Sequence, residues 1–159
     1  DWIIPLWRQV AEALPDWSLD VVGDGPLLSQ IKEEAAALGL PRISFHGKQP
    51  AMPFFEQASI YVMTSAFEGF PNTVIEAQSR GAVPVILDSY PMARAIIDDE
   101  VNGVRVVERH YGALGDAVIA LARDQERLSQ MGVSALENAR GYTLEAIAPA
   151  WEQLVRETA

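Results

Sequence analysis

The sequence predicts an α/β protein built on a doubly wound parallel sheet. Segments with helical spacing of apolar residues alternate with short strand-like segments as far as Val107. The helix and strand unit repeats without an internal linker, and 159 residues with 49% hydrophobic residues suit one domain with a single core. Because parallel neighbours need crossover connections, this alternation places helices on both faces of the sheet.

The elements follow in order along the chain. Apolar residues recur at helical spacing from Ile4 to Leu14, and the Pro15-Asp16 pair ends this first helix. The same analysis predicts strands over 18–22, 42–46, 59–63, 83–87 and 104–107, separated by helices over 27–38, 51–57, 72–80 and 91–97. The last part of the chain predicts three helices without a strand between them, over 111–123, 124–139 and 144–157. These helices either cover one end of the sheet or extend toward another domain.

Charge and cysteine content exclude several functional classes. The sequence has 12 Lys and Arg against 22 Asp and Glu, and its net charge of −10 argues against a nucleic-acid or anionic-membrane surface. The absence of cysteine removes disulfide and thiolate chemistry, and two histidines are too few for a histidine metal cluster. No stretch approaches the roughly 20 apolar residues of a membrane-spanning helix. We therefore expect a soluble domain that holds any anionic ligand by local geometry.

One strand-to-helix loop carries most of the functional information. Ligands of doubly wound sheets bind beyond the carboxyl ends of the strands, so the loops after Val22, Phe45, Met63 and Leu87 are the candidates. The loop after Met63 combines a glycine, a proline and small polar residues just before a helix begins. Such a loop can aim the unpaired amides of a helix N-terminus at a phosphate.

Two carboxylates flank this loop. Glu68 precedes the expected helix and Glu76 lies in its first turns, so both can face one cleft with the helix amides between them. A carboxylate accepts hydrogen bonds from vicinal hydroxyls such as those of a ribose or a hexose. The arrangement is suited to a sugar nucleotide.

At this point the sequence resembles a known family. Glu68, seven intervening residues and Glu76, followed by Ala77, Gly81 and Pro84, resemble the signature of the group 1, or family 4, glycosyltransferases of the GT-B fold. Other segments resemble further blocks of that family in the same order, so that the resemblance covers nearly the whole chain: 22–26, 45–47, 99–103 and 131–132. It implies the Rossmann-like C-terminal half of a GT-B enzyme, with extra C-terminal helices.

The resemblance also implies an activity and a set of site residues. Family members transfer a hexosyl unit from a nucleoside-diphosphate sugar to an acceptor in polysaccharide or glycolipid synthesis, here with retention of anomeric configuration. The first glutamate of the motif contacts the transferred sugar, which implies a catalytic-site role for Glu68, and the second holds the donor ribose, which implies Glu76. The resemblance implies further donor-binding positions at Gly23, Gly25, His46, Lys48, Gly69, Phe70, Pro71, Asn72 and Thr73.

Family members carry additional elements just before the segment where this sequence starts. These elements are a strand, a glycine-arginine turn and a lysine, and the basic side chains neutralise the departing diphosphate. We therefore expect residues 1–159 to form one nucleotide-sugar-binding domain that lacks its first strand and the N-terminal acceptor domain. Absence of that strand would open a hydrophobic slot in the sheet. The resemblance implies neither a metal nor another cofactor, and we expect a cytoplasmic enzyme, with peripheral attachment to the inner membrane as an option.

Simpler explanations exist for the same residues. Glu76 precedes Arg80 by four positions and could form an ordinary helix ion pair. Glu68 could be a solvated loop carboxylate, and His46, at the end of a strand, is more readily explained as a structural residue than as a ligand contact. Two other functional classes also fit the sequence. One is a non-catalytic nucleotide-binding module, and the other is a GT-B enzyme of another kind, such as a sugar-nucleotide epimerase.

Overall fold

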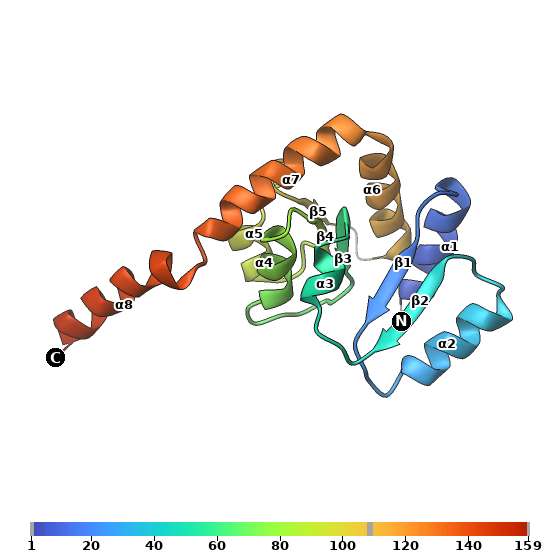
Figure 1. The fold of residues 1–159 in the computed structure, drawn as a ribbon, viewed down its shortest axis with the longest axis horizontal. Coiled ribbons are helices and arrows are strands. Elements are labelled where there is room, and N and C mark those ends of the chain that lie inside the picture. The colour runs from blue at the N-terminus through green and yellow to red at the C-terminus, as the bar shows by residue number, and fades with distance from the viewer. Residues whose placement is uncertain (1, 108–109, 159) are drawn as a thin grey trace.

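The structure is a computed structural model that describes residues 2–107 and 110–158 (Figure 1). The elements follow in the order α1 (Ile3–Ala13), β1 (Leu19–Val22), α2 (Leu28–Ala37), β2 (Ile43–Gly47), α3 (Met52–Phe55), β3 (Ile60–Met63), α4 (Asn72–Gln78), β4 (Val83–Leu87), α5 (Pro91–Ile96), β5 (Val104–Val106), α6 (Tyr111–Arg123), α7 (Gln125–Arg140) and α8 (Leu144–Thr158).

All the helices and strands expected from the sequence are present. Strand β4 agrees with its expected bounds, whereas the helix expected over 72–80 ends at Gln78. The chain turns there because Gly81 adopts a φ of +80°, a conformation that favours glycine and ends the helix. The strands pair in parallel, as expected, and helices cover both faces of the sheet (Figure 1).

The parallel strands are divided between two sheets. In the described part of the chain β1 pairs with β2, and β3, β4 and β5 form a separate group with β4 in the middle. A cavity of about 750 Å³ is lined by residues of β1 and β3, which do not pair with each other. The expected doubly wound architecture is therefore present with a gap in its sheet.

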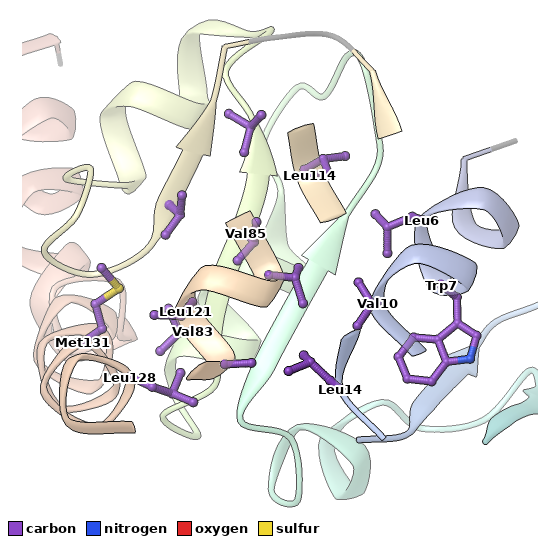
Figure 2. Packing of buried hydrophobic residues seen from close by; sticks show 14 of the residues in the cluster. Leu6, Trp7, Val10, Leu14, Val83, Val85, Leu114, Leu121, Leu128 and Met131 are labelled. Atoms are coloured by element: carbon purple, nitrogen blue, oxygen red, sulfur yellow. The ribbon is translucent and has the colours of Figure 1, made fainter. Parts of the chain in front are cut away.

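One face of the sheets carries the largest part of the core. Val83, Val85 and Leu87 of β4 pack there against α1, α6 and α7, as Figure 2 shows for Val83 and Val85. The helix residues of this cluster include Trp7, Val10, Leu114, Leu121 and Met131. Burial of this continuous apolar surface is the main force that holds the N-terminal helix on the C-terminal helices.

The other face of β4 packs against the helices that follow the site loops. Ile86 of β4 joins Met63 of β3, Val74 of α4 and Ala93 of α5 in a second buried cluster. Side chains along β4 alternate between the two faces of the sheet, so this strand contributes to both buried clusters. Every residue of the strand is buried. This packing fixes the start of α4 relative to the end of β3.

Helix α8 extends away from the body of the domain (Figure 1). All its described side chains are exposed, including Trp151 at 63%. Two roles were expected for the last helices, and α7 has the first, because it packs on the body of the domain. Helix α8 points outward and carries an exposed apolar stripe, which consists of Ile147, Trp151, Leu154 and Val155. Within the described residues, no helix is long and apolar enough to pass through a lipid bilayer.

Candidate functional site

The site loop connects β3 to α4 and is held in place by neighbouring segments. Ser89, just after β4, donates a hydrogen bond from its Oγ to the carbonyl oxygen of Ala66 over 2.7 Å. Phe70 places its ring 6.1 Å from that of Tyr142, and the neighbouring Pro71 is buried. The loop from Thr64 to Pro71 is therefore supported from two sides at the carboxyl edge of the sheet.

Two backbone amides at the start of α4 form hydrogen bonds within the turn that begins this helix. The Asn72 amide donates to the carbonyl of Phe70 over 3.0 Å, and the Val74 amide donates to the carbonyl of Pro71 over 2.9 Å. The side chains of Asn72 and Thr73 are exposed beside this turn. The Asn72 amide, at one of the expected donor-binding positions, is thus occupied by the turn itself.

Tyr61 links the end of β3 to the first turn of α4. Its hydroxyl donates a hydrogen bond to Thr73 Oγ1 over 2.9 Å. Burial raises the pKa of Tyr61, the bond to Thr73 opposes that rise, and the negative charges of Glu68 and Glu76 add to it. Both carboxylates therefore lie within electrostatic reach of the same phenol, which brings the two motif glutamates to one region.

The two carboxylates are not committed to structural partners. Glu68 is partly buried and Glu76 is exposed. Within residues 2–107 and 110–158, neither carboxylate has a hydrogen bond or ion pair. Arg80 lies instead 3.7 Å from Glu56 Oε1, so the simple helix pair between Glu76 and Arg80 is not formed. Carboxylates with free acceptor positions can bind ligand hydroxyls.

His46 makes the structural contacts that its position at a strand end suggested. Its Nε2 lies 2.6 Å from Asp20 Oδ1 on the neighbouring strand, and its ring lies 4.6 Å from that of Phe54. The His46 side chain also lines the cavity between β1 and β3. The structure thus places this residue at the carboxyl edge of the sheet, already engaged by an acidic partner.

The two glycine positions follow β1 at the same edge. Gly23 has a φ of +136°, and its amide donates to the carbonyl of Gly47 over 2.8 Å. Gly25 is exposed, and its amide is capped by Asp24 Oδ1 at 2.9 Å. Lys48 is exposed. The left-handed conformation explains why a glycine is needed at position 23.

Sequence reasoning missed several residues that shape the site. Tyr90 is 3% exposed, and its hydroxyl has no hydrogen-bond partner within the described residues. Burial raises the pKa of Tyr90, and the charges of Glu68 and Tyr61 contribute to the rise. The alternation along β3 could have assigned Tyr61 and Met63 to one face, but no local signal indicated Tyr90.

A charged cluster follows β4 beside the site. Arg94 donates to Asp88 Oδ1 over 2.9 Å, and Arg105 of β5 donates to Asp88 Oδ2 over 3.1 Å. The hydrogen bond from Arg94 holds the pKa of Asp88 below its usual range, and the Arg105 charge adds to this effect. Arg94 and Arg105 are therefore both paired with Asp88. Within its described ranges, the structure has no group of three His, Asp or Glu side chains placed to hold a metal ion.

Comparison with known proteins identifies the family. The family model described as "Glycosyl transferases group 1" matches residues 1–138. An uncharacterized glycosyltransferase of Haemophilus influenzae is 26% identical over 157 residues, which cover 98% of this chain and 44% of the relative. The poly(glycerol-phosphate) alpha-glucosyltransferase of Bacillus subtilis is 29% identical over 136 residues, 84% of this chain and 20% of the relative. The chain spans less than half the length of either relative.

Solved structures show the same fold. The pneumococcal O-GlcNAc transferase GtfA, crystallised with UDP and GlcNAc, superposes with a TM-score of 0.89 at 23% identity, over 99% of this chain and 32% of GtfA. Anabaena HepE with UDP and glucose gives a TM-score of 0.84 at 19% identity, over 96% of this chain and 44% of HepE. The fold is thus the Rossmann-like half of a GT-B architecture. Since the family model covers most of the sequence, the chain belongs to the group 1 glycosyltransferases.

Proposed function

We propose that this chain is the donor-binding domain of a glycosyltransferase that moves a sugar from a nucleoside-diphosphate sugar to an acceptor with retention of anomeric configuration. The observation that carries the proposal is the pair of uncommitted carboxylates, Glu68 in the loop before α4 and Glu76 within α4. The UDP complexes of GtfA and HepE, which share the fold, support it.

Each part of the site has a chemical task in this proposal. The Glu68 carboxylate accepts hydrogen bonds from hydroxyls of the transferred sugar and fixes its orientation. Glu76 accepts those of the ribose. The backbone of Gly69 to Thr73 lines the sugar and the diphosphate, and the loops at Gly23 to Gly25 and at His46 to Lys48 approach the nucleotide. We propose a reaction without a metal, in which basic groups and amides stabilise the departing diphosphate.

The proposal extends to the intact protein. We propose that an N-terminal domain outside residues 1–159 supplies the acceptor site, and that the enzyme acts in the cytoplasm or at the inner face of the membrane. Residues 1–159 alone should therefore bind donor without appreciable transfer. Efficient transfer by the 159-residue chain, measured by release of nucleoside diphosphate with a panel of acceptors, would contradict this division of labour.

Donor binding is tested by thermal shift with nucleoside diphosphates and their sugars. Saturating ligand at about 100 times its Kd should raise the Tm by about 5 °C or more, because it stabilises the folded state by about 2.7 kcal/mol. At the same ligand concentration Glu76→Ala should lower the rise by about half or more, because 10-fold weaker binding leaves about 1.4 kcal/mol of stabilisation. Glu56→Ala, which removes the partner of Arg80 outside the site, should keep the full rise. If no nucleotide shifts the Tm and Glu76→Ala changes nothing, the proposal is wrong.

A further inference from the structure

Tyr90 carries a buried hydroxyl that has no partner. The residue follows β4, is 3% exposed and belongs to the second buried cluster, together with Met63, Val74 and Ile86. Within residues 2–107 and 110–158 its hydroxyl makes no hydrogen bond. A phenylalanine would bury the same ring without an unsatisfied polar group, and native proteins keep few such groups. The hydroxyl therefore needs an explanation beyond packing.

The backbone holds Tyr90 beside the loop that carries Glu68. Strands β3 and β4 are paired in parallel, so the loops that follow them leave the sheet side by side at its carboxyl edge. The Ser89 hydroxyl donates to the carbonyl of Ala66 over 2.7 Å. This bond ties the residue directly before Tyr90 to a position two residues before Glu68. The two side chains thus come from neighbouring segments that are bonded to each other.

The chemistry of the two side chains is complementary. The negative charge of Glu68 acts on the hydroxyls of both Tyr61 and Tyr90. Tyr61 already donates its proton to Thr73. Burial raises the pKa of Tyr90, so its phenol keeps its proton at neutral pH and can donate it to an acceptor. In the described part of the chain the Glu68 carboxylate accepts no hydrogen bond, so an unused donor and an unused acceptor lie within electrostatic reach of each other.

We propose that the Tyr90 hydroxyl donates a hydrogen bond to one oxygen of the Glu68 carboxylate when the nucleotide sugar is bound, and so orients the other oxygen toward the hydroxyls of the transferred sugar. Tyr90 is a positioning residue, since it acts on the sugar through Glu68. The inference rests on the proposed donor-binding function.

Binding of the sugar gives a reason for this bond to form. Glu68 is partly exposed, and water can solvate its carboxylate. A bound sugar displaces that water, and a carboxylate in drier surroundings is stabilised more strongly by a hydrogen-bond donor from the protein. An ionised carboxylate has about four acceptor positions, so one oxygen can bind Tyr90 while the other binds the sugar.

Tyr90→Phe tests the proposal, because it removes only the hydroxyl. The intact protein is first screened against UDP, GDP, ADP and dTDP and their hexose and N-acetylhexosamine derivatives. The diphosphate and sugar pair that raises the Tm of the wild type most is then used. In titration calorimetry Tyr90→Phe should bind the nucleotide sugar about 5- to 10-fold more weakly and the nucleoside diphosphate with unchanged affinity. A residue that only supports the fold would not separate the two ligands.

The stability of the protein without nucleotide gives a second readout. Because the hydroxyl has no partner in the structure, Tyr90→Phe should leave the Tm within about 1 °C of the wild type or raise it. Tyr111→Phe is the matched control. It removes the same group at an exposed position at the start of α6 and should change neither the Tm nor the affinity for either ligand.

A double-mutant cycle connects the effect to Glu68. Glu68→Ala removes the proposed acceptor, so adding Tyr90→Phe to this variant should change its affinity for the nucleotide sugar by less than about twofold. A further loss of the full 5- to 10-fold would assign the hydroxyl to a group other than Glu68 and overturn the inference.

The remaining outcomes are also decisive. Unchanged binding of the nucleotide sugar by Tyr90→Phe would reject the inference, as would equal losses for both ligands or a Tm lowered by several degrees. If the wild type binds a nucleotide and Tyr90→Phe behaves like it, the inference fails and the proposed function stands. If the wild type binds no member of the panel, the proposed function fails and the inference fails with it.

Discussion

The hydroxyl of Tyr61 donates a hydrogen bond to Thr73 Oγ1 over 2.9 Å and thereby joins the end of β3 to the first turn of α4. This bond spans the base of the loop that carries Glu68. It links the two elements whose relative position decides whether the motif glutamates face the same ligand.

The energy of this bond can be measured with a double-mutant cycle. Tyr61→Phe and Thr73→Val should each lower the free energy of unfolding, and the double variant should lose less than their sum, with a coupling of about 0.5–1.5 kcal/mol. Urea unfolding of the four proteins checks this. Additive effects would show that the bond does not couple β3 to α4 in solution.

Glu68 and Glu76 should affect different parts of the donor. Under the proposed roles, Glu76→Gln weakens binding of both the nucleoside diphosphate and its sugar, because both contain the ribose. Glu68→Gln weakens binding of the nucleotide sugar only. Titration calorimetry should show a loss of about 10-fold, the value of one hydrogen bond to a charged group. Glu56→Gln serves as a control, and equal losses for both ligands in Glu68→Gln would reject the assignment.

The acid stability of the domain should depend on Asp88. The Arg94 hydrogen bond lowers the pKa of this carboxyl in the folded state, so its contribution to stability is present above the unfolded pKa of about 3.9. The contribution is lost as the pH falls through the lowered folded pKa. Asp88→Asn should therefore lower the Tm at pH 7 by about 2–4 °C and differ less from the wild type near pH 2. A difference that is constant with pH would contradict the assignment.

A buried amide network fixes the end of α4. Gln78 is fully buried, donates to the Asn102 carbonyl over 3.0 Å and accepts from Asn138 over 2.8 Å. Gln78→Leu removes both hydrogen bonds, although Asn138 keeps its bond to the Ile96 carbonyl over 3.1 Å, and should lower the free energy of unfolding by about 1–3 kcal/mol. Gln57→Leu makes the same change at an exposed site and should have an effect within about 0.5 kcal/mol. Equal effects in chemical denaturation would argue against a structural role for the network.

Local signals explain why the elements could be predicted. Proline and glycine breaks such as Pro15 and Gly39 act within a few residues, and the spacing of apolar side chains is visible in a short window. The motif residues Glu68 and Glu76 could also be placed, because both lie near one strand-to-helix junction. The contacts around these two residues could be described only from the structure.

The contacts that complete the site join distant parts of the chain. Helical spacing allowed an ion pair between Arg80 and Glu76, but Arg80 pairs with Glu56, just after α3. The network around Gln78 crosses 60 positions to Asn138, and such a distance leaves no pattern in one sequence.

The outward position of α8 has a consequence for how the domain is made. The buried hydrophobic residues of the described chain end at Ala139, and the described side chains from position 143 onward are exposed. Because α8 follows every described core residue in the chain, the buried core is complete without any residue of this helix. The body of the domain therefore does not need α8 in order to fold, and the exposed apolar side chains of this helix are left for contacts outside the core.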